Sequence, residues 1–247
     1  MFPFHFVTAK VDAHCAIIQH KQKSLQKKMT KLIIFDLDGT LIDTRKDIAD
    51  ACNHALEQCG YPARKLEEYN MLVGRGIYNL FRSALPQGKA DEATVSRMAG
   101  YFIPYYDEHM CDYTKPYDGI IEMLDRLHEK GVQFAVASNK YQDGTEQLVE
   151  KFFGKYGFVK ILGQREGKPI KPDPLIVTEA MEGVPGITLD EVIYCGDSDV
   201  DMQTGMNAGV KTIGVTWGFR TREELEAYSP WALIDRPQDI TDIIYGN

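Results

Sequence analysis

The sequence predicts an α/β fold, in which a mostly parallel sheet carries helices on both faces and a small all-helical segment follows the first strand. Two observations predict it. Short apolar runs alternate with helical patterns through residues 115–247, which is typical of a parallel sheet covered on both sides. Residues 44–114 show helical patterns and no convincing strand. We therefore expect a core formed by residues 30–43 and 115–247, with residues 44–114 inserted into it.

The first strand is expected at residues 32–35, where β-branched and aromatic residues suit a buried strand. Asp36 and Asp38 follow directly, and residues two apart on an extended chain point the same way. Gly39 allows a sharp turn after them. Two like charges so close are costly unless a cation or a proton lies between them. This strand end is therefore a candidate site.

The remaining elements are expected in the following order. An amphipathic helix at residues 45–59 begins the insertion, because its apolar residues recur at helical spacing. Helical patterns continue to residue 110, with breaks at residues 74–76 and 85–88. The core then continues with helices at 120–129 and 144–153, from Pro174 and after Asp197, and with strands at 132–138, 159–163, 191–195, 211–216 and 231–234.

Polar side chains follow several of these strands. In parallel sheets the ligand site gathers at the carboxyl ends of the strands. Carboxylate oxygens suit Mg²⁺, whereas a hydroxyl, turn amides and an ammonium suit a phosphoryl group. Together they predict that Mg²⁺ neutralises the carboxylates so that a phosphate can approach one of them. The candidate residues are Asp36, Asp38, Ser138, Asn139, Lys171, Asp197 and Asp201.

Each of these groups has an ordinary explanation when it is taken alone. Aspartates commonly begin turns, and a lysine before a proline is usually a solvated surface residue. Asp197 and Asp201 could merely complement the dipole of the helix that they begin. The joint occurrence at successive strand ends, in this order, is what indicates a site.

These residues resemble the four motifs of the haloacid dehalogenase-like superfamily of aspartate-dependent phosphohydrolases. The resemblance covers about residues 30–245, and it implies a Rossmann-like core with a small helical cap at residues 44–114. Residues 73–77 and 214–218 look like the phosphoglycolate phosphatase branch. The motifs are Asp36-Leu-Asp38-Gly-Thr40, Ser138, Lys171-Pro, and Gly196-Asp197 with Asp201.

The resemblance also implies a role for each residue. Asp36 would attack phosphorus and Asp38 would act as acid and then as base. Ser138 and Lys171 would hold the phosphoryl oxygens, assisted by the chain at Gly39, Thr40 and Asn139. Mg²⁺ would be the cofactor. Its ligands would be the Asp36 carboxylate, the Asp38 carbonyl, Asp197 and, through water, Asp201.

The expected substrate is a small phosphorylated metabolite, with 2-phosphoglycolate as the best candidate. Arg75, between two glycines of the cap, could bind a substrate carboxylate, although an exposed charge is the simpler explanation. Residues 42–46 and 111–118 are expected to be hinges. A sugar phosphomutase or sugar phosphatase of the β-phosphoglucomutase type would keep all four motifs. A non-catalytic interaction protein would need neither Asp38 nor Lys171.

Composition limits the partners and the compartment. The net charge of −8 argues against a general nucleic-acid binder, and the sequence lacks an apolar run long enough for a membrane span. The five cysteines are scattered, which favours reduced thiols in a cytoplasmic protein. The sequence does not decide between a monomer and a homodimer.

Residues 1–29 differ from the rest of the chain. They carry five lysines against one aspartate and show no sustained apolar periodicity. An interrupted apolar stretch and the lack of arginine argue against a secretory or transit peptide. We expect this atypical extension to lie outside the fold, with Met29 as the natural start and the preceding residues as an upstream translation artefact.

Overall fold

The computed structural model describes residues 30–245, so the predictions for residues 1–29 lie outside the described residues. Six parallel strands form one sheet in the order β5–β4–β1–β6–β7–β8. The predicted fold class is thereby confirmed, and each expected strand is present within a few residues of its expected bounds. The strands are β1 (Leu32–Phe35), β4 (Gln133–Tyr141), β5 (Lys160–Gln164), β6 (Val192–Gly196), β7 (Lys211–Val215) and β8 (Ala232–Ile234).

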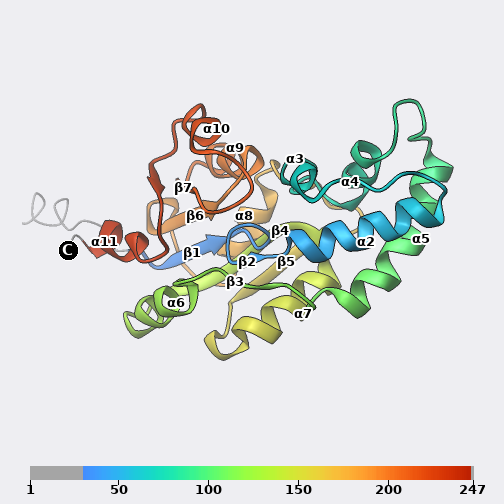
Figure 1. The fold of residues 1–247 in the computed structure, drawn as a ribbon. Coiled ribbons are helices and arrows are strands. Elements are labelled where there is room, and N and C mark those ends of the chain that lie inside the picture. Colours follow the sequence, from blue (N-terminus) through green and yellow to red (C-terminus); the bar gives the residue numbers. More distant parts are fainter. Residues whose placement is uncertain (1–29, 246–247) are drawn as a thin grey trace, which may run out of the picture.

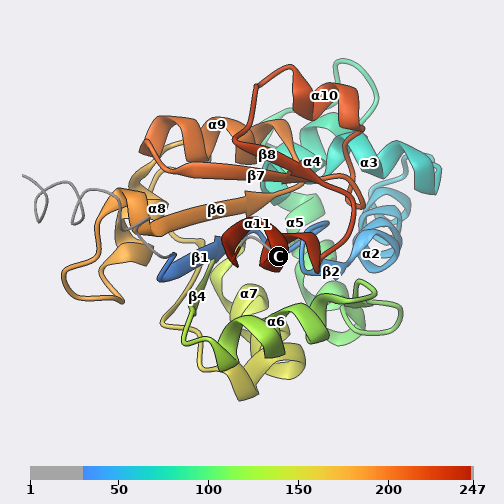
Figure 2. The same ribbon diagram turned by 90° about the vertical axis from the view of Figure 1, so that its left-hand side faces the viewer.

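Helices cover both faces of the sheet (Figures 1 and 2). On one face lie α6 (Ile120–Glu129), α7 (Gln142–Phe153) and α11 (Asp239–Tyr245), and on the other lie α8 (Leu175–Met181) and α9 (Asp199–Ala208). Short α10 (Arg222–Glu226) packs against α9 and β8. Two single 3₁₀ turns, η2 (Gly154–Tyr156) and η3 (Leu189–Glu191), complete the connections.

The two faces are buried by alternate residues of each strand. In β1, Ile33 and Phe35 belong to a hydrophobic cluster with residues of α6 and α7, whereas Leu32 and Ile34 belong to a second cluster with residues of α8. All four side chains are buried. This two-sided burial explains why β1 is a continuous apolar run rather than an alternating one.

The inserted segment forms helices beside the carboxyl end of the sheet (Figure 1). Its long helices, α2 and α5, pack against each other, and the apolar stripe predicted for residues 45–59 faces this contact with Ile48, Cys52, Ala55 and Leu56 buried. The whole segment contains α2 (Arg45–Gln58), η1 (Leu66–Glu68), α3 (Tyr69–Leu72), α4 (Ile77–Ala84) and α5 (Glu92–His109).

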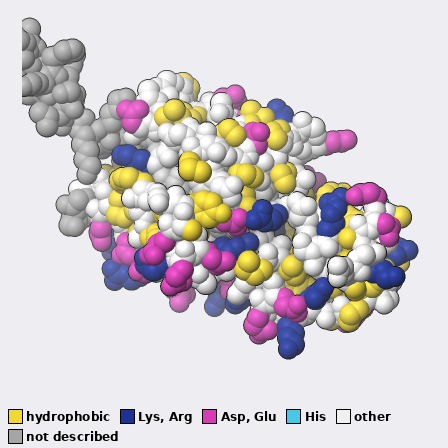
Figure 3. All heavy atoms as spheres, turned by 90° about the horizontal axis from the view of Figure 1, so that it is seen from above, with side chains coloured by type: hydrophobic (Ala, Val, Ile, Leu, Met, Phe, Trp, Pro, Cys, Tyr) yellow, Lys and Arg dark blue, Asp and Glu magenta, His cyan; other side chains and the backbone are white. Residues whose placement is uncertain are grey.

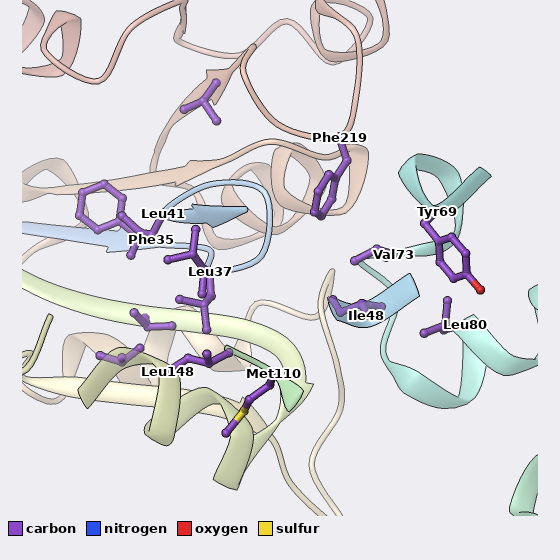
Figure 4. Close-up of a cluster of buried hydrophobic side chains, with 14 of the residues drawn as sticks. Phe35, Leu37, Leu41, Ile48, Tyr69, Val73, Leu80, Met110, Leu148 and Phe219 are labelled. Atoms are coloured by element: carbon purple, nitrogen blue, oxygen red, sulfur yellow. The ribbon is translucent and has the colours of Figure 1, made fainter. Parts of the chain in front are cut away.

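One hydrophobic cluster runs from the sheet into this segment. Figure 4 shows the sheet-side residues Leu37 and Leu41 together with Val73 and Leu80 of the inserted segment, and Phe219 of the loop after β7 lies between them. Apolar contact therefore holds the inserted helices against the core.

The two chain crossings between the core and the insertion lie together, which the sequence did not predict. Strands β2 (Ile42–Asp43) and β3 (Lys115–Pro116) form a short antiparallel ladder. The buried carboxylate of Asp47 accepts hydrogen bonds from Tyr113 N at 3.1 Å and from Thr114 Oγ1 at 2.7 Å. The division into a core and a cap, and the expected hinges at these crossings, remain predictions.

Within residues 30–245, no helix combines the length and apolarity needed to cross a bilayer. Seen from above, acidic, basic and hydrophobic side chains are interspersed over the surface (Figure 3).

Candidate active site

The loop after β1 brings Asp36 and Gly39 to the carboxyl edge of the sheet. Asp36 stays in the sheet ladder through its amide, which donates to Cys195 O at 2.8 Å, and Gly39 N then closes the turn on Ile42 O at 2.9 Å. Gly39 has a φ of +92°, and a Cβ there would lie 2.4 Å from Asp197 Oδ2. This position therefore requires glycine for both its backbone conformation and its close approach to a carboxylate.

Three buried carboxylates, those of Asp36, Asp197 and Asp201, form the centre of the site. One oxygen from each lies within 4.8 Å of the others. Burial, reinforced by the charge of Asp201, raises the pKa of Asp197 to about 7, and the same two causes raise the pKa of Asp36 well above its ordinary value. Carboxylates this close together ionise readily only when a cation lies among them. A cluster of hard oxygens fits a divalent cation such as Mg²⁺.

Lys171 lies against this cluster. Its Nζ is 2.8 Å from Asp36 Oδ1 and 2.7 Å from Asp201 Oδ1, and it donates to Tyr194 OH at 3.1 Å. Burial alone would lower the pKa of the ammonium, but Asp201 and Asp36 hold the pKa well above its ordinary value. Lys171 is therefore a fixed positive charge beside Asp36, where it can stabilise a phosphoryl oxygen.

The cluster is held in place by the elements around it. Asp197 accepts hydrogen bonds from Phe219 N at 2.7 Å and Thr40 Oγ1 at 3.0 Å. Asp201 accepts a hydrogen bond from Ser198 Oγ at 2.5 Å, and it belongs to the capping box at the start of α9. Helix α9 begins at Asp199 with Ser198 as its N-cap, so Asp201 lies at the helix start as predicted, whereas Asp197 precedes the cap. Both carboxylates converge on Asp36, so helix capping does not account for them.

Ser138 and Asn139 lie in β4, which extends to Tyr141 instead of ending at residue 138. Its pairing with β5 shifts register between Ala137 and Tyr141, an irregularity that re-aims side chains. Ser138 is buried at the pocket, and its hydroxyl accepts from Lys140 N at 3.1 Å. Asn139 accepts from Lys171 N at 2.9 Å and donates to Gly74 O at 3.0 Å. Asn139 therefore positions the Lys171 loop and contacts the inserted segment.

Asp36 and Asp38 line the same pocket but pair with different cations. Lys140 Nζ lies 3.0 Å from Asp38 Oδ1, whereas Lys171 pairs with Asp36. The sequence patterns did not single out Lys140. Its position directly after Ser138 and Asn139 could have indicated it, but β4 was expected to end before this residue.

Arg75 does not reach this pocket. Its side chain is 52% exposed, and Nη2 lies 2.5 Å from Asp199 Oδ2. The same carboxylate group pairs with buried Arg220, whose Nε is 3.5 Å from Asp199 Oδ1. Arg220 also donates to the carbonyls of Asn70 and Val73. Both arginines therefore connect the core and the inserted segment, and Arg220 was another residue that sequence reasoning missed.

The pocket lies between the strand ends and the inserted helices. The space in it that the centres of water-sized groups can occupy is about 40 Å³. Its polar side consists of Asp36, Asp38, Ser138, Asn139 and Lys140, with Tyr141 beside them. Its other side consists of Ile48, Val73, Gly74, Gly76, Ile77, Leu80, Phe102 and Tyr106.

A parallel sheet with buried strand-end carboxylates and a lysine beside the first of them defines a class, that of α/β proteins with a strand-end site suited to a cation and a phosphoryl group. The family can then be stated. Residues 33–215 match the model of the haloacid dehalogenase-like hydrolases, and this chain belongs to that family.

Curated relatives are similar in sequence to this chain along most of their length. The phosphoglycolate phosphatase of Mesorhizobium japonicum is 31% identical over 212 residues, which cover 85% of this chain and 92% of that protein. The phosphoglycolate phosphatase of Pseudomonas putida is 32% identical, with 84% of this chain and 77% of that protein covered. The predicted resemblance to this branch and the prediction of a phosphatase are confirmed.

Solved structures are similar as well. A provisionally assigned phosphoglycolate phosphatase from Lactobacillus delbrueckii subsp. bulgaricus is 30% identical, with a TM-score of 0.81 and coverage of 89% of this chain and 100% of that one. A predicted phosphoglycolate phosphatase from Haemophilus somnus is 27% identical, with a TM-score of 0.80 and coverage of 87% of this chain and 97% of that one.

Proposed function

We propose that this protein is a Mg²⁺-dependent phosphomonoesterase that forms an aspartyl-phosphate on Asp36 and acts on 2-phosphoglycolate. The observation that carries the proposal is the position of Asp36, beside the ammonium of Lys171 and within one cluster with the carboxylates of Asp197 and Asp201. A carboxylate in this position can be both a cation ligand and a nucleophile. The names and similarity of the relatives support the choice of substrate.

The first half of the reaction transfers the phosphoryl group to the protein. A carboxylate oxygen of Asp36 attacks phosphorus while the bond from phosphorus to the ester oxygen breaks, and Asp38 gives its proton to the departing alkoxide. Lys171 and the Ser138 hydroxyl hold the phosphoryl oxygens, with the chain amides around Gly39, Thr40 and Asn139 beside them.

The second half restores the enzyme. The Asp38 carboxylate takes a proton from water as the water oxygen attacks phosphorus, and the bond to Asp36 breaks to release inorganic phosphate. Asp36, the Asp38 carbonyl and Asp197 would hold Mg²⁺, with Asp201 supporting through water. When bound, the cation supplies charge neutralisation for the carboxylates and the phosphoryl group. The apolar wall opposite excludes water from the site.

The proposal is tested with a panel of small phosphate esters, assayed with Mg²⁺ and after its removal by a chelator. We expect 2-phosphoglycolate to have the highest kcat/KM, well above hexose phosphates, and activity to return when Mg²⁺ is added back. Preferred hydrolysis of hexose phosphates would contradict the substrate assignment. Interconversion of sugar phosphates would favour the phosphomutase alternative, and a lack of activity on every ester would contradict an enzyme.

A further inference from the structure

One buried cation of the pocket is not needed for the chemistry proposed above. Lys140 is 4% exposed, and within the described residues it is the cationic side chain that lines the pocket. Lys171 already serves the nucleophile, and Arg75 is exposed and paired with Asp199. The burial of an ammonium is costly, so its position in a small ligand pocket needs a reason.

Lys140 has unused capacity to donate hydrogen bonds. Its ammonium lies 3.0 Å from Asp38 Oδ1, yet that oxygen has no hydrogen-bond partner in the described residues, so the contact is a poorly aligned ion pair. The ammonium also lies 4.7 Å from the centre of the Tyr106 ring. An ammonium has three N–H donors, and these contacts leave donors for a ligand.

A second donor of the same pocket is also unpartnered. Tyr106 is fully buried, its hydroxyl has no hydrogen-bond partner among the described residues, and the residue lines the same pocket as Asp38 and Lys140. Burial, with the nearby charge of Asp38, raises the pKa of this hydroxyl, so it stays protonated and can donate. A buried hydroxyl without a partner is costly, and an anionic ligand would supply the missing acceptor.

From this arrangement we infer that Lys140 and Tyr106 bind a carboxylate of the substrate, so that the enzyme selects phosphate esters of short 2-hydroxy acids. The inference rests on the proposed function and names the group that its site recognises. Asp38 is the acid that would protonate the ester oxygen, and Lys140 is its direct neighbour. A carboxylate on Lys140 must therefore lie very close to that oxygen, as in an ester with one carbon between the two groups.

The apolar lining of the pocket agrees with this substrate class. Ile77, Leu80 and Phe102 offer no hydrogen-bond partners to the hydroxyls of a hexose, whereas a two-carbon acid brings no further polar groups to this wall. The inference also replaces Arg75 as the expected carboxylate ligand, because the guanidinium of Arg75 is already paired outside the pocket.

The test compares two esters of equal length that differ in charge, 2-phosphoglycolate and 2-hydroxyethyl phosphate. The measured quantity is the ratio of their kcat/KM values in the full-length protein with Mg²⁺. Lys140→Met should reduce this ratio by about 10- to 100-fold, as expected for the loss of a charge-assisted hydrogen bond, and mainly by raising the KM for the glycolate ester. Tyr106→Phe should reduce it by a smaller factor.

Lys155→Met is the matched control, because Lys155 is an exposed lysine that pairs with Asp125 and also lies over a tyrosine ring. It should leave the ratio unchanged. If Lys140→Met lowers the kcat/KM values of both esters by the same factor, Lys140 only positions Asp38 and the inference is overturned. The inference would also be overturned if Arg75→Ala reduced the ratio of kcat/KM values and Lys140→Met did not.

A binding measurement separates this inference from the proposed function. The probe is 3-phosphonopropionate, in which a methylene replaces the ester oxygen, and calorimetry gives its Kd with Mg²⁺ present. We expect Lys140→Met to weaken binding at least about tenfold. If the wild-type protein hydrolyses neither ester but shows this difference in binding, the proposed function fails and the carboxylate site stands. Equal Kd values in the two proteins would overturn the site.

Discussion

The two walls of the pocket are built from different kinds of side chain. The strand ends contribute carboxylates, a hydroxyl, an amide and an ammonium, with Asp36 paired to Lys171 and Asn139 accepting from the Lys171 amide. The inserted helices contribute mainly apolar side chains, such as Ile48, Leu80 and Phe102, together with the single hydroxyl of Tyr106. A fixed polar wall is suited to chemistry, whereas an apolar wall controls the size of what enters and excludes water.

This difference explains why family resemblance identifies the reaction more readily than the substrate. The polar wall contains the motif residues Asp36, Asp38 and Ser138, and a change in either aspartate would disturb the lysine that pairs with it. The apolar wall can change residue by residue with little effect on the cluster around Asp36. Substitutions in each wall, and in the contact between the walls, test whether the reaction and the choice of substrate can be changed independently.

Asp36→Asn should have the largest effect, a loss of at least about 10³-fold in kcat, because it removes the proposed nucleophile. The change retains the shape of the side chain, so the fold should survive. Steady-state kinetics with 2-phosphoglycolate and a circular dichroism melt measure the two quantities. Residual activity within tenfold of the wild-type protein would contradict the role of Asp36.

Asp197→Asn should remove the stabilisation by Mg²⁺. A cation that binds only the folded state stabilises it by about 2.7 kcal/mol when its concentration is 100 times Kd. The wild-type protein should therefore show a Tm that rises with Mg²⁺, and the variant should not. Asp199→Asn is the matched control, since Asp199 lies outside the carboxylate cluster. Equal shifts in wild type and Asp197→Asn would place the cation elsewhere.

Arg220→Met should weaken the contact between the two walls. Arg220 is 4% exposed and donates to the carbonyls of Asn70 and Val73, so its loss leaves buried acceptors unpaired. Hydrogen bonds to charged groups contribute about 2 kcal/mol. Chemical denaturation should show a loss of unfolding free energy of about this size, with a rise in KM larger than the fall in kcat. An unchanged unfolding free energy would show that the apolar contacts suffice.

Arg75→Ala should have the smallest effect, although Arg75 contacts the same Asp199 carboxylate. Its side chain is half-exposed, and exposed ion pairs contribute about 0–1 kcal/mol. We expect less than about a twofold change in kcat/KM for 2-phosphoglycolate, measured beside Arg220→Met. A large and selective rise in KM would restore Arg75 as the carboxylate ligand.

The parts of this picture that could be predicted are those that depend on local patterns. The apolar run before Asp36 and the alternation of strands with helices predicted the sheet, and parallel strand ends must meet at one edge. The approach of Asp197 and Asp201 to Asp36 followed from that geometry.

The parts that could not be predicted depend on contacts across the fold. Lys140 was missed because the irregular end of β4, which aims it at Asp38, leaves no pattern in the sequence. Arg220 was missed because its acceptors are backbone carbonyls about 150 residues earlier. For Arg75, two neighbouring glycines suggested a loop that could reach the substrate, but an exposed charge was the simpler expectation, and Asp199 holds the guanidinium outside the pocket.

The stereochemical course at phosphorus tests the central claim, covalent transfer to Asp36, most directly. The measurement uses 2-phosphoglycolate made chiral at phosphorus with oxygen isotopes, and it determines the configuration of the inorganic phosphate after hydrolysis in isotopically labelled water. Two successive displacements, by Asp36 and then by water, predict net retention. Net inversion would mean that water attacks the ester directly, and it would contradict the account.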